Sequence, residues 1–312
     1  MDRLNKTSLS DFILTGLTDV PWLQKLLFIF VLFFYQLGNM GNIIIIILAI
    51  RDPSLHSPMY FFLANLSFLD ICFSSVTVPK MMVGFWIQNV ISIKACIVQM
   101  YFFQALGFSE GVLLSAMGYD RYVAICHPLR YRIIMRRSIC FYLVFLSWSA
   151  GLTTSLVNAL MTSQLPFCNV NRVRHFYCDV KPVIKLACRD ISVNEITLLY
   201  FSGFICTGTF ILTVLSYFYI ICHFVNHQSS KGRPKAFSTC SAHLTVVMLF
   251  YGTAMCTYLG PDSEASIESD RVAAILATVI TPSLNPVIYT LRNKEVRNSL
   301  RSMFKTSHLE NY

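Results

Sequence analysis

The sequence predicts an all-α membrane protein: a seven-transmembrane helix bundle with its N-terminus outside the cell. Three observations predict this fold class: the apolar composition, seven long windows almost free of charge, and the distribution of basic residues between them. Of the 312 residues, 55% are hydrophobic and only 13% are charged, about half the usual share of ~25%. A soluble domain with so little charge could not cover its surface. The lipid bilayer is therefore the expected surrounding of the chain.

Each expected helix lies on a window that is long enough to cross a bilayer, which takes about 20 apolar residues. Asp70 and Glu110 are the single charges inside the second and third windows, and His243 is the titratable residue of the sixth. No repeat or Gly/Ser-rich linker interrupts the pattern, so residues 1–312 are expected to form one seven-helix domain. The expected helices are about 26–50, 58–80, 95–120, 138–160, 196–222, 236–261 and 272–291.

The chain has a net charge of +9. A nucleic-acid-binding module would not be this apolar, so no nucleic-acid partner is expected. With the N-terminus outside, the cytosolic segments hold 14 Lys and Arg residues and the outer segments hold 11. This small bias is clearest in loop 120–137, where five arginines lie near helix ends. The sequon at Asn5 agrees with an outer N-terminus and makes Asn5 a candidate glycosylation site.

Four of the eleven cysteines are expected outside the membrane: Cys96 at the top of the third helix, and Cys168, Cys178 and Cys188 in loop 161–195. Four cysteines allow three pairings. Spacing alone does not choose among these pairings.

Polar residues of four helices are expected at one depth in the inner half of the membrane. Counting at 1.5 Å per residue from the cytosolic helix ends places them in one layer, and they are Asn42, Asp70, Glu110 and Asn285. Ionisable residues are expensive in lipid, so a shared polar network is expected. Two acids so close would either bind a cation or share a proton.

A second polar layer is expected nearer the cytosol. By the same count it contains Arg121, Tyr217, His243 and Tyr289. An arginine with hydroxyl and imidazole partners can exchange contacts, as a two-state latch requires. Interfacial snorkelling explains Arg121 and Tyr289 equally well, but it does not explain His243, which lies further in.

Nothing in the sequence indicates an enzyme, because no phosphate loop, metal-ligand spacing or nucleophile elbow occurs. A transporter would favour broken helices at matching positions of two halves. Pro282 and Pro286 both lie in the seventh helix, with no counterpart in the first half. A channel or transporter is therefore disfavoured.

Four strings together resemble the olfactory receptors, a branch of the rhodopsin-like G-protein-coupled receptors. They are LHSPMYFFL at 55–63, MGYDRYVAIC at 117–126, KAFSTCSAHL at 235–244 and PSLNPVIY at 282–289. The resemblance covers residues 41–296, and the short loop 161–195 is similar to the class II, terrestrial-vertebrate type. Gly118 departs from the family, which usually has Ala there, and should slightly loosen the third helix.

The resemblance implies roles for residues that the spacing left open. It implies the disulfides Cys96–Cys178 and Cys168–Cys188. It also implies a cation-linked acidic pair of Asp70 and Glu110, a candidate sodium site that Asn42 would support; no other cofactor is expected. The implied residues for G-protein coupling and switching are Asp120, Arg121, Tyr122, Tyr217, His243, Asn285, Pro286 and Tyr289.

The family's ligand pocket lies in the outer half of the bundle, between the third, fifth, sixth and seventh helices. The matching residues carry no charge, so the resemblance implies a small, neutral, mostly apolar volatile odorant, although Lys181 and Lys185 in the outer loop could attract an anion. Ordinary packing between helices is the alternative for each residue. The matching residues are Phe103, Gln104, Gly107, Phe108, Ser202, Ile205, Tyr251, Ala254, Met255, Tyr258 and Thr278.

The implied function is odorant binding that activates a stimulatory olfactory-type G protein and raises cyclic AMP at the plasma membrane of olfactory cilia. In the expected mechanism, odorant contact with Tyr258 and Tyr251 draws the outer sixth helix inward. Its inner end then swings out and breaks a contact between His243 and Arg121. The alternative function is a rhodopsin-like receptor for an endogenous metabolite in non-olfactory tissue, which the sequence cannot separate from odour sensing.

Overall fold

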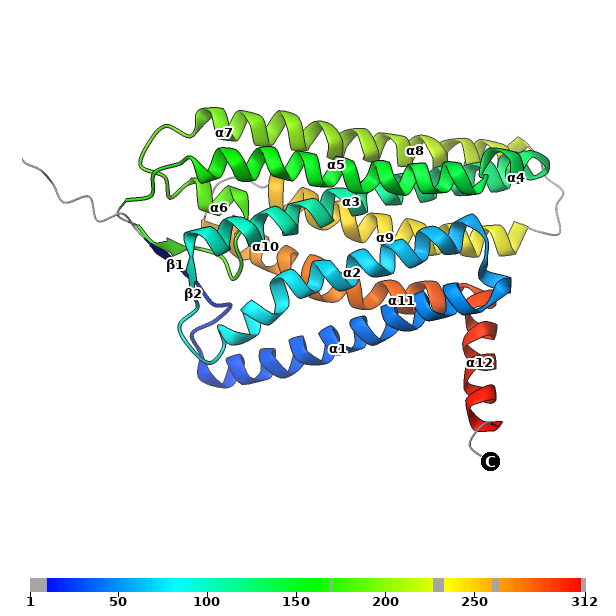
Figure 1. The fold of residues 1–312 in the computed structure, drawn as a ribbon, viewed down its shortest axis with the longest axis horizontal. Helices are drawn as coiled ribbons and strands as arrows, with labels where there is room; N and C mark the ends of the chain where they lie inside the picture. Colours follow the sequence, from blue (N-terminus) through cyan, green and yellow to red (C-terminus); the bar gives the residue numbers. More distant parts are fainter. Residues whose placement is uncertain (1–9, 169, 227–232, 260–263, 310–312) are drawn as a thin grey trace, which may run out of the picture.

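In the computed structural model, the described residues are 10–168, 170–226, 233–259 and 264–309. They form a bundle of long helices along the longest axis of the molecule (Figure 1). A small β-sheet closes one end, and a helix lies crosswise at the other end. Asn5, the candidate glycosylation site, lies outside the described residues.

Seven helices of the described chain are long and apolar enough to cross a membrane, as the sequence predicts. The third helix is longer than expected at both ends, and the fifth begins at Ser192 rather than near 196. The spans lie on α1 (Pro21–Arg51), α2 (Pro58–Val83), α3 (Ile93–Cys126), α5 (Arg137–Ser163), α7 to α8 (Ser192–Asn226), α9 (Arg233–Leu259) and α10 to α11 (Ser269–Thr290).

Local sequence explains where several helices begin. Pro21 and Pro58 start α1 and α2, where a proline loses no hydrogen bond because the first N–H groups of a helix have no partner. The Ser92 hydroxyl caps α3 by accepting a hydrogen bond from the Ala95 N–H at 3.3 Å. Between α1 and α2, Asp52 caps the short helix η1 (Pro53–Leu55) in the same way through the Ser54 N–H.

Two of the spans contain a π-helical turn that the sequence analysis did not predict. In the fifth span, η3 (Leu198–Ser202) lies between α7 (Ser192–Thr197) and α8 (Gly203–Asn226). In the seventh span, η4 (Leu276–Ile280) joins α10 (Glu264–Ile275) to α11 (Thr281–Arg292). Such turns are frequently found at functional sites.

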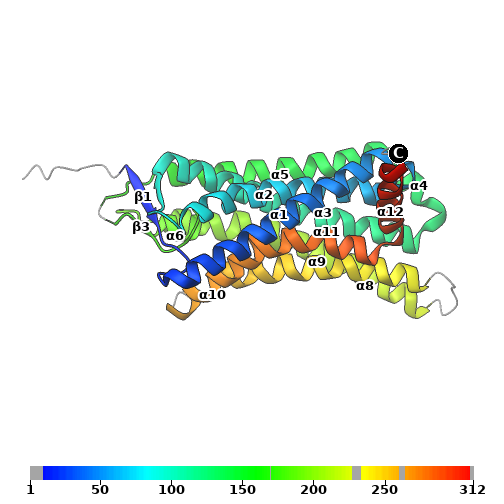
Figure 2. The same ribbon diagram turned by 90° about the horizontal axis from the view of Figure 1, so that it is seen from below.

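A three-stranded sheet caps the outer end of the bundle (Figure 2). Strand β1 (Asp11–Leu14) pairs with β2 (Val90–Ser92) antiparallel and with β3 (Arg172–Val173) parallel. The Phe12 side chain of β1 is fully buried, and its ring packs edge-on against Phe167 with a centroid distance of 5.1 Å. Strand β1 is therefore part of the cap.

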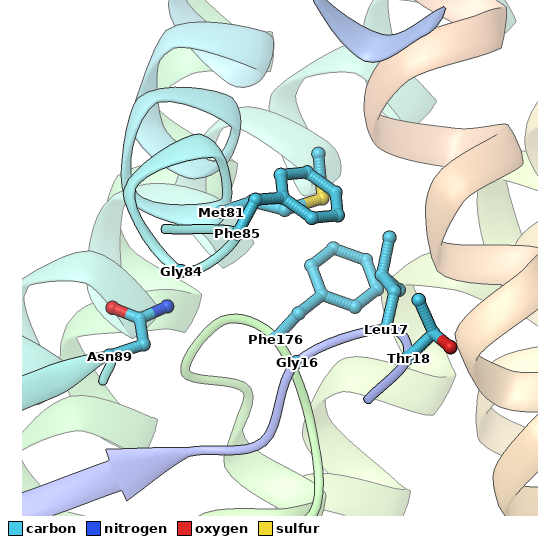
Figure 3. Close-up of a pocket in the computed structure, with 8 residues that line it drawn as sticks. All are labelled: Gly16, Leu17, Thr18, Met81, Gly84, Phe85, Asn89 and Phe176. Atoms are coloured by element: carbon cyan, nitrogen blue, oxygen red, sulfur yellow. The ribbon is translucent and has the colours of Figure 1, made fainter. Parts of the chain in front are cut away.

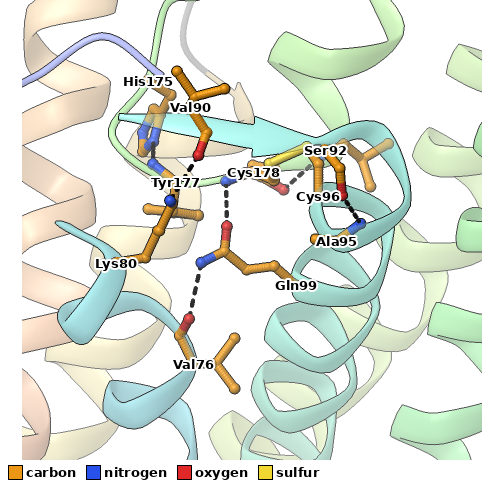
Figure 4. The surroundings of a disulfide bond; sticks show 12 residues. Val76, Lys80, Val90, Ser92, Ala95, Cys96, Gln99, His175, Tyr177 and Cys178 are labelled. Carbon is orange, nitrogen blue, oxygen red and sulfur yellow. Dashed lines mark hydrogen bonds between the residues drawn. A yellow bond between two sulfur atoms is a disulfide. The ribbon is translucent and has the colours of Figure 1, made fainter. Parts of the chain in front are cut away.

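Both disulfides implied by the resemblance are present, Cys96–Cys178 and Cys168–Cys188. Figure 4 shows the first, which joins the top of α3 to the second outer loop. Beside it, the Gln99 side chain accepts a hydrogen bond from the Cys178 N–H at 3.0 Å and donates to the Val76 carbonyl at 2.9 Å. The loop is thus fixed to both α2 and α3. After Cys178, it continues into the short helix α6 (Val180–Ile184).

The cytosolic end carries the short helices η2 (Pro128–Arg130) and α4 (Tyr131–Ile134), and the crosswise helix α12 (Lys294–Leu309) (Figure 1). Helix α12 is not among the helices predicted from the sequence. Val296, Leu300 and Met303 lie on one face of this helix at helical spacing and pack against the core. This amphipathic spacing is a signal for α12, but α12 contains charged residues and therefore does not lie in a charge-free window.

Helix α3 passes through the centre of the bundle and packs closely against α5. At Gly151 of α5, an added Cβ would overlap the Ala105 carbonyl and the Ser109 hydroxyl of α3. Only glycine allows the two backbones to approach this closely, as is common between membrane helices. This contact brings the side chains of α5 next to the outer half of α3.

Candidate functional site

Gln104 and Ser202, two expected ligand residues from different helices, are joined by a third residue. The Asn158 side chain of α5 donates one hydrogen bond to Gln104 Oε1 at 3.1 Å and another to Ser202 Oγ at 3.0 Å. All three side chains are buried. Asn158 is not among the residues predicted from the sequence, although an amide in a long apolar window is a signal that could have revealed it.

Phe103 lies in an aromatic stack beneath the outer loop. Its ring centroid is 4.9 Å from that of Phe73 on α2 and 4.5 Å from that of Tyr177 in the loop. One turn further, the same Phe73 ring lies beside Gly107, where an added Cβ would be in ordinary van der Waals contact with it at 3.6 Å. Gly107 and Phe108 are half-buried, so protein does not completely cover this face of α3.

Tyr251 connects the sixth span to the third and fifth. Its hydroxyl lies 2.9 Å from Thr209 Oγ1 on α8 and 3.3 Å from the Gly111 carbonyl on α3. The side chain is buried, and its ring packs against Phe210 and Phe250. A movement of Tyr251 would therefore act on three helices at once.

Tyr258 is held by the outer loop. Its hydroxyl donates to the two carboxylate oxygens of Asp179 at distances of 3.2 and 3.1 Å, and the Val180 N–H donates to the same carboxylate at 2.7 Å. Burial raises the pKa of Asp179 to about 6. Lys181 Nζ donates to the Thr257 carbonyl at 3.4 Å. The loop thus has two connections to the outer end of α9.

The remaining expected ligand residues lie on the fifth, sixth and seventh spans. The Thr278 hydroxyl is fully buried and donates to the Ala274 carbonyl of its own helix at 2.7 Å. Ile205 and Ala254 are half-buried, whereas Met255 is 41% exposed. Thr278 lies in the π-helical turn η4.

A small cavity lies outside this set, between the N-terminal segment and the outer loops (Figure 3). Its volume of about 10 Å³ suits no more than a single water molecule. It is too small to hold an odorant. Its lining residues are Gly16, Leu17, Thr18, Met81, Gly84, Phe85, Asn89 and Phe176.

In the deeper polar layer, Asp70 and Asn285 are in direct contact. Asn285 Nδ2 donates to both carboxylate oxygens of Asp70 at 3.1 and 3.0 Å. Asn42 Nδ2 donates instead to the Pro282 carbonyl of the seventh span at 2.9 Å. Glu110 is buried next to this pair in the sequence-predicted layer, and its Oε1 accepts no hydrogen bond from the described residues. In and near this layer, four buried oxygens have no hydrogen-bond partner in the described part of the chain: Glu110 Oε1, Asn42 Oδ1, Asn285 Oδ1 and Tyr289 Oη.

The cytosolic layer differs from the expected latch, because the predicted contact between His243 and Arg121 is absent. Arg121 pairs with the neighbouring Asp120, whose carboxylate also accepts a hydrogen bond from the Tyr131 hydroxyl at 2.7 Å. The expectation was wrong because a buried carboxylate beside the guanidinium is a stronger partner than an imidazole. Tyr131 is a partner that the depth count missed.

His243 instead holds the third and fifth spans to the sixth. Its Nε2 lies 3.1 Å from the Leu114 carbonyl, and its Nδ1 lies 2.7 Å from the Tyr217 hydroxyl. A carbonyl can only accept, so Nε2 carries the proton and Nδ1 accepts from Tyr217. His243 is fully buried, and its contacts are made by a neutral ring.

The other expected switch residues lie around this layer. The Tyr122 hydroxyl is 3.1 Å from His127 Nε2. Pro286 packs against α1, where an added Cβ at Gly41 would lie 2.8 Å from the proline ring. Tyr289 is buried, and its hydroxyl has no hydrogen-bond partner among the described residues.

Comparison with known proteins gives one consistent result. A family model described as olfactory receptor matches residues 29–307. Olfactory receptor 12D1 of Homo sapiens is 49% identical over 305 residues, covering 97% of this chain and 95% of the relative. Olfactory receptor 12D2 of Homo sapiens is 47% identical over 299 residues, covering 95% of this chain and 97% of the relative. The crystal structure of squid rhodopsin is similar in fold, with a TM-score of 0.66 at 19% identity over 92% of this chain and 87% of that one.

Proposed function

Because the chain belongs to the olfactory receptor family of rhodopsin-like G-protein-coupled receptors, we propose that it binds a small, neutral, mostly apolar volatile in the outer half of the bundle. Binding then activates a stimulatory olfactory-type G protein and raises cyclic AMP. Members of this family are signalling receptors and not enzymes, and the chain is a multi-pass plasma membrane protein.

One observation carries the ligand class: the polar side chains that join the third, fourth and fifth spans in the outer half are amides and a hydroxyl, without charge. Gln104, Asn158 and Ser202 form this polar cluster. The nearby charged side chains of the loop, Asp179 and Lys181, make hydrogen bonds to the sixth span. A volatile of about ten heavy atoms would then bind with roughly micromolar affinity.

The contacts of the sixth span support a route from ligand to G protein. Tyr251 and His243 lie two turns apart on α9, and both bind to α3 and α8. A ligand that displaces Tyr251 would move α9 as one rigid element. The bonds of His243 to Leu114 and Tyr217 would then break, and the cytosolic cleft beside Arg121 would open. This route replaces the expected break between His243 and Arg121.

A sodium ion between Asp70 and Glu110 is part of the proposal. The donor set fits a hard cation, because it offers two carboxylates and several buried oxygens without partners. When bound, the ion would supply the positive charge that lets both acids stay ionised. Glu110→Gln should remove the sodium dependence of receptor activation, measured in cells with sodium or choline as the external salt. Unchanged sodium dependence would contradict the site.

The function is tested by a cyclic-AMP reporter in cells that display the receptor, with a chemically diverse panel of odorants. We expect a rise in cyclic AMP for some neutral volatiles. Arg121→Ala at equal surface level is the control for coupling. A response only to carboxylates, lost in Lys181→Ala or Lys185→Ala, would contradict the neutral ligand class. Ligand-evoked current without a G protein would contradict the coupling.

A further inference from the structure

We propose that Gln104 and Ser202 present two hydrogen-bond donors to the ligand, and that the receptor therefore selects odorants with an acceptor such as a ketone or ester carbonyl. This inference rests on the proposed function and names the ligand class within it. The cluster of Gln104, Asn158 and Ser202 carries the argument.

Asn158 uses the acceptors of both neighbouring side chains. Its amide has two N–H groups, and these account for the bonds to Gln104 Oε1 and Ser202 Oγ. Each of these oxygens thus already accepts one hydrogen bond, whereas the two N–H groups of Gln104 Nε2 and the hydroxyl hydrogen of Ser202 are not used in these bonds. Asn158 is thus a positioning residue that determines which groups of the cluster are left to donate hydrogen bonds.

The Gln104 donor has no acceptor within the described protein. Gln104 is only 4% exposed, and its Nε2 is buried without a hydrogen-bond partner. A buried donor that lost its water without gaining an acceptor is costly, so folded proteins rarely keep one without a reason. A ligand oxygen is such a reason. A carbonyl oxygen has two lone pairs, so it can accept from both Gln104 and Ser202.

The surroundings of the cluster indicate the rest of the ligand. Gly107 and Phe108 follow Gln104 on the same face of α3 and are half-buried. The stack of Phe103, Phe73 and Tyr177 lies on the outer side. The ligand is therefore an apolar body with one acceptor. Ser202 ends the π-helical turn η3, an irregularity of the kind found at functional sites.

The test uses the purified full-length receptor and measures ligand-induced thermal stabilisation, which requires no G protein. The probes are linear ketones and esters, each paired with the alkane and the alcohol of the same heavy-atom number. We expect ketones and esters to bind about 5- to 10-fold more tightly than the matched alkanes, the gain from one neutral hydrogen bond. Gln104→Leu keeps the side-chain volume similar and should reduce this preference to the smaller part that the Ser202 hydroxyl supplies.

Ser202→Ala keeps the inference testable if Gln104→Leu fails to fold, and it should reduce the ketone preference by a smaller factor. Thr153→Val is the matched control, because Thr153 lies on the exposed face of α5 and its hydroxyl bonds only within that helix. It should leave the ketone preference at the wild-type ratio.

Three results would overturn the inference. Equal stabilisation by ketone and alkane series, or none by either, would mean that water satisfies Gln104. A preference for alcohols over ketones would mean that the amides present acceptors instead of donors. A ketone preference that is undiminished in Gln104→Leu would place the donor elsewhere. Ketone-selective stabilisation without any rise in cyclic AMP would support the inference and contradict only the proposed coupling.

Discussion

The two ends of the bundle are held together by different kinds of contact. At the outer end, segments far apart in sequence are joined by two disulfides, the three-stranded sheet and the bond from Tyr258 to Asp179. At the cytosolic end, Arg121 pairs with its own neighbour Asp120. There the sixth span is held to the third and fifth by His243 through bonds of a neutral ring.

This difference assigns ligand recognition to the outer end of the bundle and switching to the cytosolic end. Covalent and sheet contacts fix the shape of the outer cap, which a selective pocket requires. Neutral hydrogen bonds contribute only about 0.5–1.5 kcal/mol each, so a ligand can offset the loss of the two bonds of His243. A substitution that breaks contacts at the outer end is therefore expected to unfold the receptor, whereas one at the cytosolic end is expected to abolish coupling.

The largest effect is expected from breaking the outer cap at Cys96 or Cys178. Either Cys→Ser change should cost about 2–5 kcal/mol, because the bridge closes a long loop. The surface level, measured by immunostaining of intact cells, should fall to near background. The double mutant should resemble each single mutant, because paired residues are not additive. Peptide mapping that joined Cys96 to Cys168 would refute the pairing.

At the cytosolic end, Arg121→Ala should abolish coupling and leave folding intact. The fully buried carboxylate of Asp120 would keep only its bond from Tyr131, and the G-protein cleft would lose its cation. Cyclic-AMP output should vanish at normal surface level, while ligand-induced thermal stabilisation persists. If output persisted, or if the receptor disappeared from the surface, the two ends would not differ as described.

A pH titration sharpens the comparison at Asp179. Its pKa of about 6 is above the ordinary value of 3.8 because of burial. The folded state therefore holds this proton more tightly than the unfolded state. The stability that this carboxyl contributes is fully present below pH 3.8 and is lost as the pH rises through 6. The loss at pH 7.5 is about 3 kcal/mol. Asp179→Asn removes the titration, so the melting temperature of the wild type should rise relative to this variant from pH 7.5 to pH 5.

The wild type must be compared with Asp179→Asn because His175 changes the stability of the protein with pH in the opposite direction. Burial lowers its pKa to about 3, so its contribution to stability is lost as the pH falls below the ordinary value of 6.5. This contribution is present in both the wild type and Asp179→Asn, and it cancels in their difference. A difference independent of pH would show that Asp179 does not titrate in the cap.

The smallest effect is expected from Tyr258→Phe, which removes one hydroxyl from the connection between loop and sixth span. The odorant response should weaken about 5- to 10-fold, equivalent to about 1 kcal/mol. Tyr258→Ala should cost more, since the ring contact is lost as well. In concentration–response curves, Tyr258→Phe and Asp179→Asn should be non-additive. Full additivity would mean that the Tyr258 hydroxyl acts on the ligand and not through the loop.

The seven spans could be predicted from sequence because length and charge suffice to define a membrane helix. Residue counting gives the depth of a side chain along the helix axis, and it placed Asp70 and Asn285 in one layer, where they are in contact. It does not give the direction of a side chain around the axis, and for this reason His243 was assigned the wrong partner. Asn158 was missed because a single uncharged amide does not interrupt an apolar window. The π-helical turns depend on a one-residue change of hydrogen bonding, for which no residue type is a signal.

The position of β1 in the cap has a consequence for the order of biosynthesis. The Thr15 hydroxyl donates to the Val173 carbonyl, 158 residues further along the chain. At ribosomal speed, this separation corresponds to roughly 10 to 30 seconds of synthesis. During this interval the strand with Phe12 has been delivered to the luminal side but lacks its parallel partner. A strand with one free edge can bind chaperones, so maturation of the receptor is expected to depend on the time between the synthesis of β1 and that of β3.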